Sequence, residues 1–392
     1  MLRAGVGHSI SNNPRVAAEE ATQIAMGQAG LRTAGGAICF ATAAYGGAYP
    51  MMLNAVAAAA GTAEVAGCSS AGVIAGGREI ESGHAIAVIV FGGDNLRGKR
   101  LFAPTLRGRP REVAAELAAA ARPALGRNNL LCLFPDTYNA DPSSLLDALA
   151  SELPGVTIVG GGASEDGTIG ETFQFCGDVV SNNSVAAMLL AGEFELNIGA
   201  SIACTPLGRT HRVTAVRDNV ILELDGRRAF DVFAEAAGAL AADLHRAAAF
   251  VFAGIPLDPA AERLERGRFL VRNIVGASAE HGAIAIAHRC KVGDMIGLVL
   301  RNGERAREDL KVALEEMSGR GGRAALGLYF NCVSRGAGLY GMPDHDSAYI
   351  ANYLGDLPIG GFFTGFEIGP LGPATAPLQY SGVLALICEP AS

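Results

Sequence analysis

The fold is decided by a stretch that reads Leu130-Leu-Cys-Leu-Phe134, then a helical segment from Pro142 to Leu153, then Val156-Thr-Ile-Val-Gly-Gly-Gly-Ala-Ser-Glu165. An apolar strand, an Ala/Leu-rich helix and a second apolar strand predict a βαβ unit. The crossover makes the two strands parallel and the connection right-handed. Asp141 is a good N-cap for the helix, and proline at the next position loses no needed hydrogen-bond donor.

Two further segments repeat this order, and each of the three is followed by an antiparallel continuation. The other copies combine residues 37–42, 50–60 and 63–72, and residues 325–330, 347–354 and 357–367; the continuations are 79–91, 172–190 and 377–388. We therefore expect a fold between α/β and α+β, in which repeated βαβ units are followed by antiparallel hairpins and mixed sheets are covered by outer helices.

The amino-acid composition and net charge limit the kinds of partner that we expect the protein to have. The 392 residues are 50% hydrophobic and carry a net charge of -8, which suits a large packed core and disfavours a nucleic-acid partner. The basic stretch 97–111 is interpreted as a solvated linker rather than a phosphate-binding arm. The uncharged stretch 33–63 is broken by glycines and Pro50, which predicts no membrane insertion.

Eight cysteines are scattered through apolar runs with no C-x-x-C spacing. This pattern predicts reduced, buried thiols, a cytoplasmic location and no zinc site. Asp344-His345-Asp346 is the densest group of potential metal ligands, but it precedes a helix, so we interpret it as a cap and expect no metal.

Several glycine-rich strings, in this order, resemble the FIST family, the sensory domains named for F-box and intracellular signal transduction proteins. The strings are Val65-Ala-Gly-Cys-Ser-Ser-Ala-Gly72, Val159-Gly-Gly-Gly-Ala-Ser164 with Thr172-Phe-Gln-Phe175, Arg272-Asn-Ile-Val275, Asn331-Cys-Val-Ser-Arg-Gly336, and Gly360-Gly-Phe-Phe363 with Glu367-Ile-Gly-Pro370. The resemblance implies an N-terminal FIST domain over 30–210, with two βαβ repeats, and a C-terminal FIST domain over 211–390, with the third and most diverged repeat.

The resemblance also implies a sensory protein that binds a small ligand, an amino acid or similar metabolite, and passes the response to a partner signalling protein or through a homo-oligomer. Ligands of open α/β units lie beyond the carboxyl ends of the parallel strands. We therefore expect the ligand to be bound there, by residues of the three matching turns and nearby strands: Cys68, Ser69, Ser70, Ala163, Ser164, Asn273, Asn331, Arg335, Phe366 and Glu367.

Charge suggests roles for two of these residues. Arg335 could form a bidentate pair with a ligand carboxylate, and Glu367 could accept a ligand ammonium. The structural alternative is an ion pair between the two. Arg272 and Asn273 lie next to each other on a predicted strand, so they face opposite sides and only one can point at a shared cavity.

Two other functions remain open at this point. Some FIST relatives resemble haem-binding nitric-oxide sensors that regulate a partner kinase, although no histidine of the chain stands out as an axial ligand and we expect no cofactor. A hydrolase or transferase using Cys68 or a nearby serine is the other alternative, but no G-x-S-x-G spacing is present and no catalytic residue is predicted.

Overall fold

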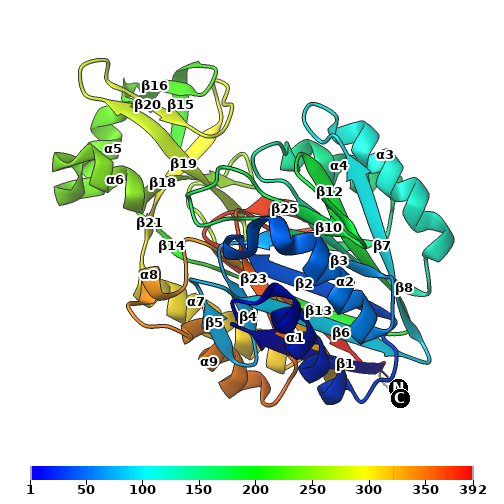
Figure 1. The fold of residues 1–392 in the computed structure, drawn as a ribbon. Helices are drawn as coiled ribbons and strands as arrows, with labels where there is room; N and C mark the ends of the chain where they lie inside the picture. The colour runs from blue at the N-terminus through cyan, green and yellow to red at the C-terminus, as the bar shows by residue number, and fades with distance from the viewer. Residues whose placement is uncertain (1, 321, 391–392) are drawn as a thin grey trace.

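The computed structural model describes residues 2–320 and 322–390. These residues form a larger lobe of three six-stranded sheets and a smaller lobe inserted into its third unit (Figure 1). Both parallel and antiparallel pairs occur in each of the three sheets, and helices cover their outer faces, which confirms the predicted fold class.

The three sheets share one strand order. The first runs β1 (Leu2–Ser9), β6 (Ile86–Gly93), β2 (Gly36–Thr42), β3 (Val65–Ser70), β10 (Gln174–Cys176) and β11 (Val179–Ser181). The second runs β7 (Leu96–Pro104), β12 (Ser184–Gly192), β8 (Asn128–Pro135), β9 (Thr157–Gly161), β24 (Glu367–Leu371) and β25 (Ala374–Leu378). The third runs β13 (Glu195–Ile202), β26 (Ser381–Cys388), β22 (Ala324–Cys332), β23 (Ile359–Thr364), β4 (Val73–Ala75) and β5 (Arg78–Ile80).

Each sheet borrows its last two strands from another unit. The hairpin β10–β11 of the second unit completes the first sheet, β24–β25 of the third unit completes the second, and β4–β5 of the first unit completes the third. The three units are therefore interlocked in a ring.

A pair of helices packs on the outer face of each sheet. They are α1 (Pro14–Ala29) and α2 (Tyr49–Ala60) on the first, α3 (Pro110–Ala121) and α4 (Pro142–Glu152) on the second, and α7 (Gly303–Ser318) and α9 (His345–Leu354) on the third. The predicted start of α4 is confirmed, because the Asp141 side chain accepts a hydrogen bond from the backbone N–H of Ser144. Short helical turns are η1 (Ala43–Ala48), η2 (Arg122–Ala124) and α8 (Ala337–Tyr340).

The inner faces of the sheets share one apolar core. Phenylalanine rings from different sheets meet at its centre: Phe40 stacks on Phe362 at 4.3 Å between ring centroids and meets the edge of Phe134 at 5.3 Å. Because each sheet contributes to this core, the carboxyl ends of the three parallel strand pairs are held in fixed relation to one another.

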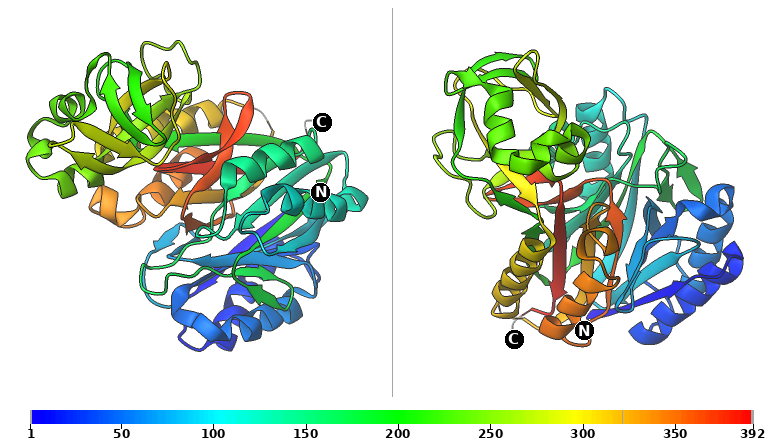
Figure 2. Two further views of the ribbon diagram at one scale, coloured as in Figure 1. Left: turned by 90° about the horizontal axis from the view of Figure 1, so that it is seen from above. Right: turned by 90° about the vertical axis from the view of Figure 1, so that its left-hand side faces the viewer.

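The smaller lobe lies between β13 and α7 in the chain and forms the upper left of Figure 1. It contains β14 (Cys204–Pro206), β15 (His211–Arg217), β16 (Val220–Leu224), β17 (Arg227–Arg228), α5 (Ala229–Ala237), η3 (Gly238–Ala242), α6 (Leu244–Phe250), β18 (Val251–Pro256), β19 (Phe269–Ser278), β20 (Ala283–Ile286) and β21 (Met295–Arg301). The views in Figure 2 show it standing apart from the three sheets.

One local expectation is corrected by the structure. The basic stretch 97–111 is not a linker: most of it forms β7 at the edge of the second sheet, where several residues are partly exposed, and the rest leads into α3. In the smaller lobe, α5 ends at Ala237, because Gly238 has a φ of +57° that an α-helix cannot continue through.

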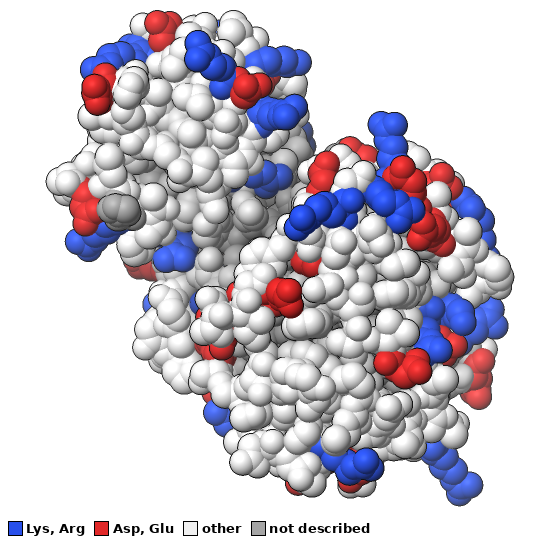
Figure 3. All heavy atoms as spheres, turned by 45° about the horizontal axis from the view of Figure 1, so that its top comes forward, with Lys and Arg blue, Asp and Glu red and all other residues white. Residues whose placement is uncertain are grey.

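On the face in Figure 3, basic and acidic side chains are interspersed over both lobes, and a hollow separates the lobes. None of the described helices is long and apolar enough to cross a membrane.

Candidate functional site

The three turns singled out in the sequence meet in the structure. We call them the corner cluster: residues 68–72, 162–165 and 363–367. The backbone N–H of Ser164 donates to the carbonyl of Ser69 at 3.2 Å, and that of Gly162 donates to Phe366 at 2.8 Å. The backbone N–H of Phe363 donates to the carbonyl of Gly72 at 2.9 Å, so segments almost 300 residues apart in the chain are joined directly.

The hydroxyl groups of Ser69 and Ser164 bond to backbone groups of the corner cluster and of the adjacent Phe173. Ser69 Oγ donates to the carbonyl of Ser164 at 3.2 Å and accepts from the N–H of Phe173 at 2.9 Å. Ser164 Oγ donates to the carbonyl of Phe363 and accepts from the N–H of Ala71. Each hydroxyl is buried and has both a donor and an acceptor, so these two serines hold the turns together.

The other members of the first two turns are also buried. Cys68 and Ala163 belong to the central apolar core, each with no exposed surface. Ser70 is equally buried, and its Oγ has no hydrogen-bond partner among the described residues. Ligand contact by the corner cluster therefore stays a prediction, because its surface is closed in this conformation.

Arg335 lies in a fully buried network of the third unit. Its Nε and Nη2 both donate to the Asp346 carboxylate, and Nη2 also donates to Tyr340 Oη at 2.7 Å. Asn331 Nδ2 and Tyr329 Oη donate to the same carboxylate. The ion-pair partner of Arg335 is thus Asp346 at the start of α9, and not Glu367, the partner named by the structural alternative.

Glu367 is a buried carboxyl group with hydroxyl and amide donors around it. It accepts from Thr364 Oγ1 at 2.6 Å, from the N–H of Ser381 at 3.0 Å and from Ser381 Oγ at 2.5 Å. Burial raises its pKa to about 7, and the hydrogen bonds only partly offset that effect. The preceding Phe366 packs in the core of the second sheet.

Asn273 lies away from the corner cluster, at the contact between the lobes. Its Oδ1 accepts a hydrogen bond from Tyr380 Oη at 2.7 Å, and Tyr380 stacks on Phe252 of the small lobe at 4.1 Å. Arg272 is paired with Ala253 in the ladder and donates only to the carbonyl of Val271. Asn273 is therefore the member of this pair that contacts the third unit.

The thiol groups are poor nucleophiles in this environment. Burial raises the pKa of Cys68 well above its ordinary value and that of Cys332 to about 12. Both side chains therefore stay protonated near neutral pH, whereas a nucleophilic cysteine needs the thiolate.

An open pocket lies at the carboxyl end of β8, where the strand-end rule places a ligand. We call it the polar pocket. Its volume is about 310 Å³, and its lining is almost entirely polar: Arg107, Asp136, Tyr138, Asn139, Gly170, Glu171, Asn182 and Asn183.

Asp136 organises this pocket. Its carboxylate accepts four hydrogen bonds, from the N–H groups of Tyr138 and Asn183, from Asn139 Nδ2 and from Thr172 Oγ1. Asn139 in turn accepts from Arg107 Nε at 2.6 Å. The buried carboxylate thereby fixes Asn139, and Asn139 orients the guanidinium group.

Two charged groups of the polar pocket have no ion pair. The Nη atoms of Arg107 make no hydrogen bond to a described residue, and Glu171 makes neither a hydrogen bond nor an ion pair with one. Both side chains are exposed. The pocket thus presents one cationic and one anionic group to solvent.

The polar pocket adjoins the corner cluster through one segment of chain. Glu171 precedes Thr172, which donates to Asp136, and Phe173, whose N–H donates to Ser69 Oγ. A ligand on Glu171 would therefore act on a segment bonded to both features.

The residues present do not fit a haem group at the pockets described here. Neither the polar pocket nor the larger pocket described below is lined by a histidine, so neither offers an imidazole axial ligand. The His345 ring packs against Tyr340 in a tilted arrangement, at 4.1 Å between ring centroids, and its Nε2 accepts from Arg307 Nε. The described residues also contain no group of three or more metal-ligating side chains.

With this architecture established, comparison with known families identifies the class of protein. The FIST N domain matches residues 37–227 and the FIST C domain matches residues 229–370. The chain belongs to the FIST family, whose domains are sensory domains of signal transduction.

Similar proteins extend over the whole chain. An uncharacterized protein of Mycobacterium tuberculosis is 30% identical over 391 residues, covering 99% of this chain and 100% of that protein. An uncharacterized protein of Mycobacterium bovis is 28% identical, with 99% of both chains covered. A crystal structure of cyanuric acid hydrolase from A. caulinodans matches 49% of this chain and 71% of that chain, at 13% identity and a TM-score of 0.29.

The polar pocket was not found from the sequence. Arg107 belongs to the stretch assigned to a linker, and Glu171 precedes a motif that was recognised only from Thr172 onward. Asp136 could have been identified as a candidate site residue, because it is the first charged residue after the apolar strand 130–134. The rule that ligands lie beyond the carboxyl ends of strands points to this residue.

Proposed function

We propose that this chain is a ligand-binding sensory protein whose polar pocket recognises a small zwitterion of the amino-acid type. The observation that carries the proposal is the pair of opposite charges, Arg107 and Glu171, at the carboxyl end of β8, neither of which forms an ion pair with a described residue. Arg107 binds the carboxylate of the ligand and Glu171 its ammonium group. Family membership supports a sensory role of this kind.

The exposure of both side chains sets the strength of binding. Hydrogen bonds to charged groups contribute about 1.5 to 3 kcal/mol each when they are shielded from water, and exposure lowers the contribution to about 1 kcal/mol or less. Ligand binding is transmitted from the polar pocket to the corner cluster through Thr172 and Phe173, which are bonded to both. The signal is then passed on through a partner protein or through self-association.

The test uses calorimetric titration with a panel of L-amino acids, each compared with its methyl ester and its N-acetyl derivative. The native protein is expected to prefer the free amino acid over both derivatives. Arg107→Gln removes the preference over the ester, because the ester lacks the carboxylate that Arg107 binds. Glu171→Gln removes the preference over the N-acetyl form for the corresponding reason.

A matched control is Arg15→Gln, which removes an exposed arginine of α1. It is expected to leave every preference unchanged. If no amino acid of the panel gives heat at millimolar concentration, or if both pocket variants keep the native preferences, the proposed site is wrong.

A further inference from the structure

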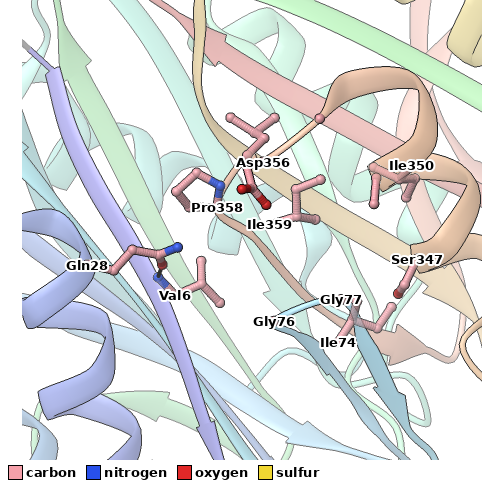
Figure 4. A pocket seen from close by; sticks show the side chains of 13 residues that line it. Val6, Gln28, Ile74, Gly76, Gly77, Ser347, Ile350, Asp356, Pro358 and Ile359 are labelled. Atoms are coloured by element: carbon pink, nitrogen blue, oxygen red, sulfur yellow. Dashed lines mark hydrogen bonds between the residues drawn. The ribbon is translucent and has the colours of Figure 1, made fainter.

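A second pocket lies between the first and third units, on the side of the third sheet covered by α9 (Figure 4). Its volume is about 420 Å³, room for about a dozen water molecules at liquid density. Strand β1 and helix α1 contribute Val6 and Gln28, the β4–β5 hairpin contributes Ile74 and the turn Gly76-Gly77, and the remaining lining residues come from α9 and the segment that follows it into β23. We call it the junction pocket, because its walls come from chain segments more than 300 residues apart.

The walls of the junction pocket are largely aliphatic. Ile74, Ile350, Ile359, Leu357 and Val6 supply branched hydrocarbon surface. The turn Gly76-Gly77 brings backbone without side chains to the rim, and both of its residues have positive φ. Apolar walls of this kind favour a ligand with a hydrocarbon body.

One polar atom inside the pocket is unsatisfied. Ser347 is only 6% exposed, and its Oγ makes no hydrogen bond of ordinary geometry with a described residue, although it lies near enough to the Glu79 carboxyl to lower the pKa of that group. Its backbone N–H donates to Glu79 Oε1 at 2.7 Å. A buried hydroxyl without a partner is costly, so this atom marks a place where a bound molecule would gain a hydrogen bond.

Asp356 is the one charged side chain among the described residues that line the pocket. Asp356 lies between the β1 side and the α9 side in Figure 4 and forms no ion pair or hydrogen bond with a described residue. Glu79 is buried behind Ser347, and no lysine or arginine is among the described residues that line the pocket. Gln28 uses its Oε1 to accept from the N–H of Val6, which leaves its amide N–H groups as neutral donors.

We propose that the junction pocket binds a small primary amine with a hydrocarbon body. The ammonium group pairs with the Asp356 carboxylate, the body packs on Ile74, Ile350 and Ile359, and Ser347 Oγ bonds a polar atom of the ligand or of an accompanying water. A carboxylate ligand is disfavoured because it would face Asp356 without a compensating cation. This site is separate from the polar pocket, whose ligand needs a cation and an anion together.

The test compares three molecules of one shape by calorimetric titration near neutral pH: 3-methylbutylamine, 3-methylbutan-1-ol and 3-methylbutanoate. Only the amine is expected to bind in the millimolar range or better. Asp356→Asn is expected to weaken amine binding about two- to fivefold, the range for an exposed ion pair. The control Asp178→Asn removes an exposed carboxylate in the turn between β10 and β11 and leaves binding unchanged.

The proposal is overturned if the alcohol binds as tightly as the amine, if Asp356→Asn binds the amine like the native protein, or if the amine gives no heat. Asp356 is exposed, so the substitution does not threaten the fold. Arg107→Gln is expected to leave amine binding intact, which separates a failure of this proposal from a failure of the zwitterion site.

Discussion

Replacing Glu367 with glutamine is expected to reduce the pH dependence of the protein's stability. The carboxyl group is fully buried, and burial raises its pKa to about 7. Glutamine fits the same hydrogen bonds: its Oε1 accepts from the N–H and Oγ of Ser381, and its Nε2 donates to Thr364 Oγ1. The Thr364 hydroxyl proton then goes to the carbonyl of Asn331, which already lies 3.2 Å away.

The sign and size follow from the raised pKa. Between the ordinary value of 4.5 and about 7, the folded protein binds the proton that the unfolded chain releases, so stability is lost as pH rises through this window. At about 1.4 kcal/mol per pKa unit, the free energy of unfolding that Glu367 contributes at low pH and loses over this window is on the order of 3 kcal/mol. Burial raises the pKa of Glu79 to about 7 as well. The Glu367→Gln variant therefore still shows the pH dependence of stability that Glu79 contributes.

The assay is urea unfolding followed by tyrosine fluorescence from pH 5.5 to 8.5, since the chain has 8 tyrosines and no tryptophan. The quantity compared is the difference between native protein and variant at each pH. This difference cancels the opposite trend below pH 6.5 from histidines whose pKa is lowered by burial, namely His8, His288 and His345.

Glu112→Gln, at an exposed position of α3, is the matched control and should not change the pH dependence. The free energy of unfolding of the native protein minus that of Glu367→Gln should fall as pH rises and level off above about pH 8. A flat difference curve would refute the reasoning, because it would mean that burial does not raise the pKa of this carboxyl group.

Three further predictions concern buried groups described above. Asp346→Asn is expected to lower the free energy of unfolding by about 3 to 5 kcal/mol, since it leaves the Arg335 charge buried without its counter-ion; a loss below about 1 kcal/mol in urea unfolding would contradict this. Cys68 should react with a thiol reagent only in denaturant, and fast stoichiometric labelling of the native protein would show a thiolate. Tyr380→Phe removes the 2.7 Å hydrogen bond to Asn273 and should destabilise the contact between the lobes by about 1 kcal/mol. Amide hydrogen exchange should then become faster where the lobes touch. Unchanged exchange would show that the stacking of Tyr380 on Phe252 alone holds this contact.

The βαβ units could be predicted because their information is local. Apolar runs of strand length, an Asp-Pro helix start and an Ala/Leu-rich helix lie within about 35 residues of one another. Strand β1 escaped notice because Gly5 and Gly7 interrupt its pattern. These glycines let α1 pack against the strand: a Cβ at Gly5 would lie 2.1 Å from the carbonyl oxygen of Ala25.

The exchange of hairpins between units could not be predicted in the same way. The composition of a short strand such as β4 does not indicate which sheet it joins, and its partner β23 lies almost 300 residues away in the chain. The ion pair of Arg335 was missed for a related reason. Asp346 was interpreted as a helix cap, and no periodicity of the sequence indicates that α9 turns this side chain toward the end of β22.

The exchanged hairpins have a consequence for any attempt to divide the protein. A fragment cut where the FIST N match ends, at residue 227, would keep β4–β5 but lose β23, the strand that this hairpin extends. The same cut would separate β24 from β9, so that β9 would become an edge strand with unpaired backbone N–H and C=O groups. Exposed edge strands of this kind pair with other chains and promote aggregation. We expect such halves to aggregate when made separately and to recover their native form only when they are produced together.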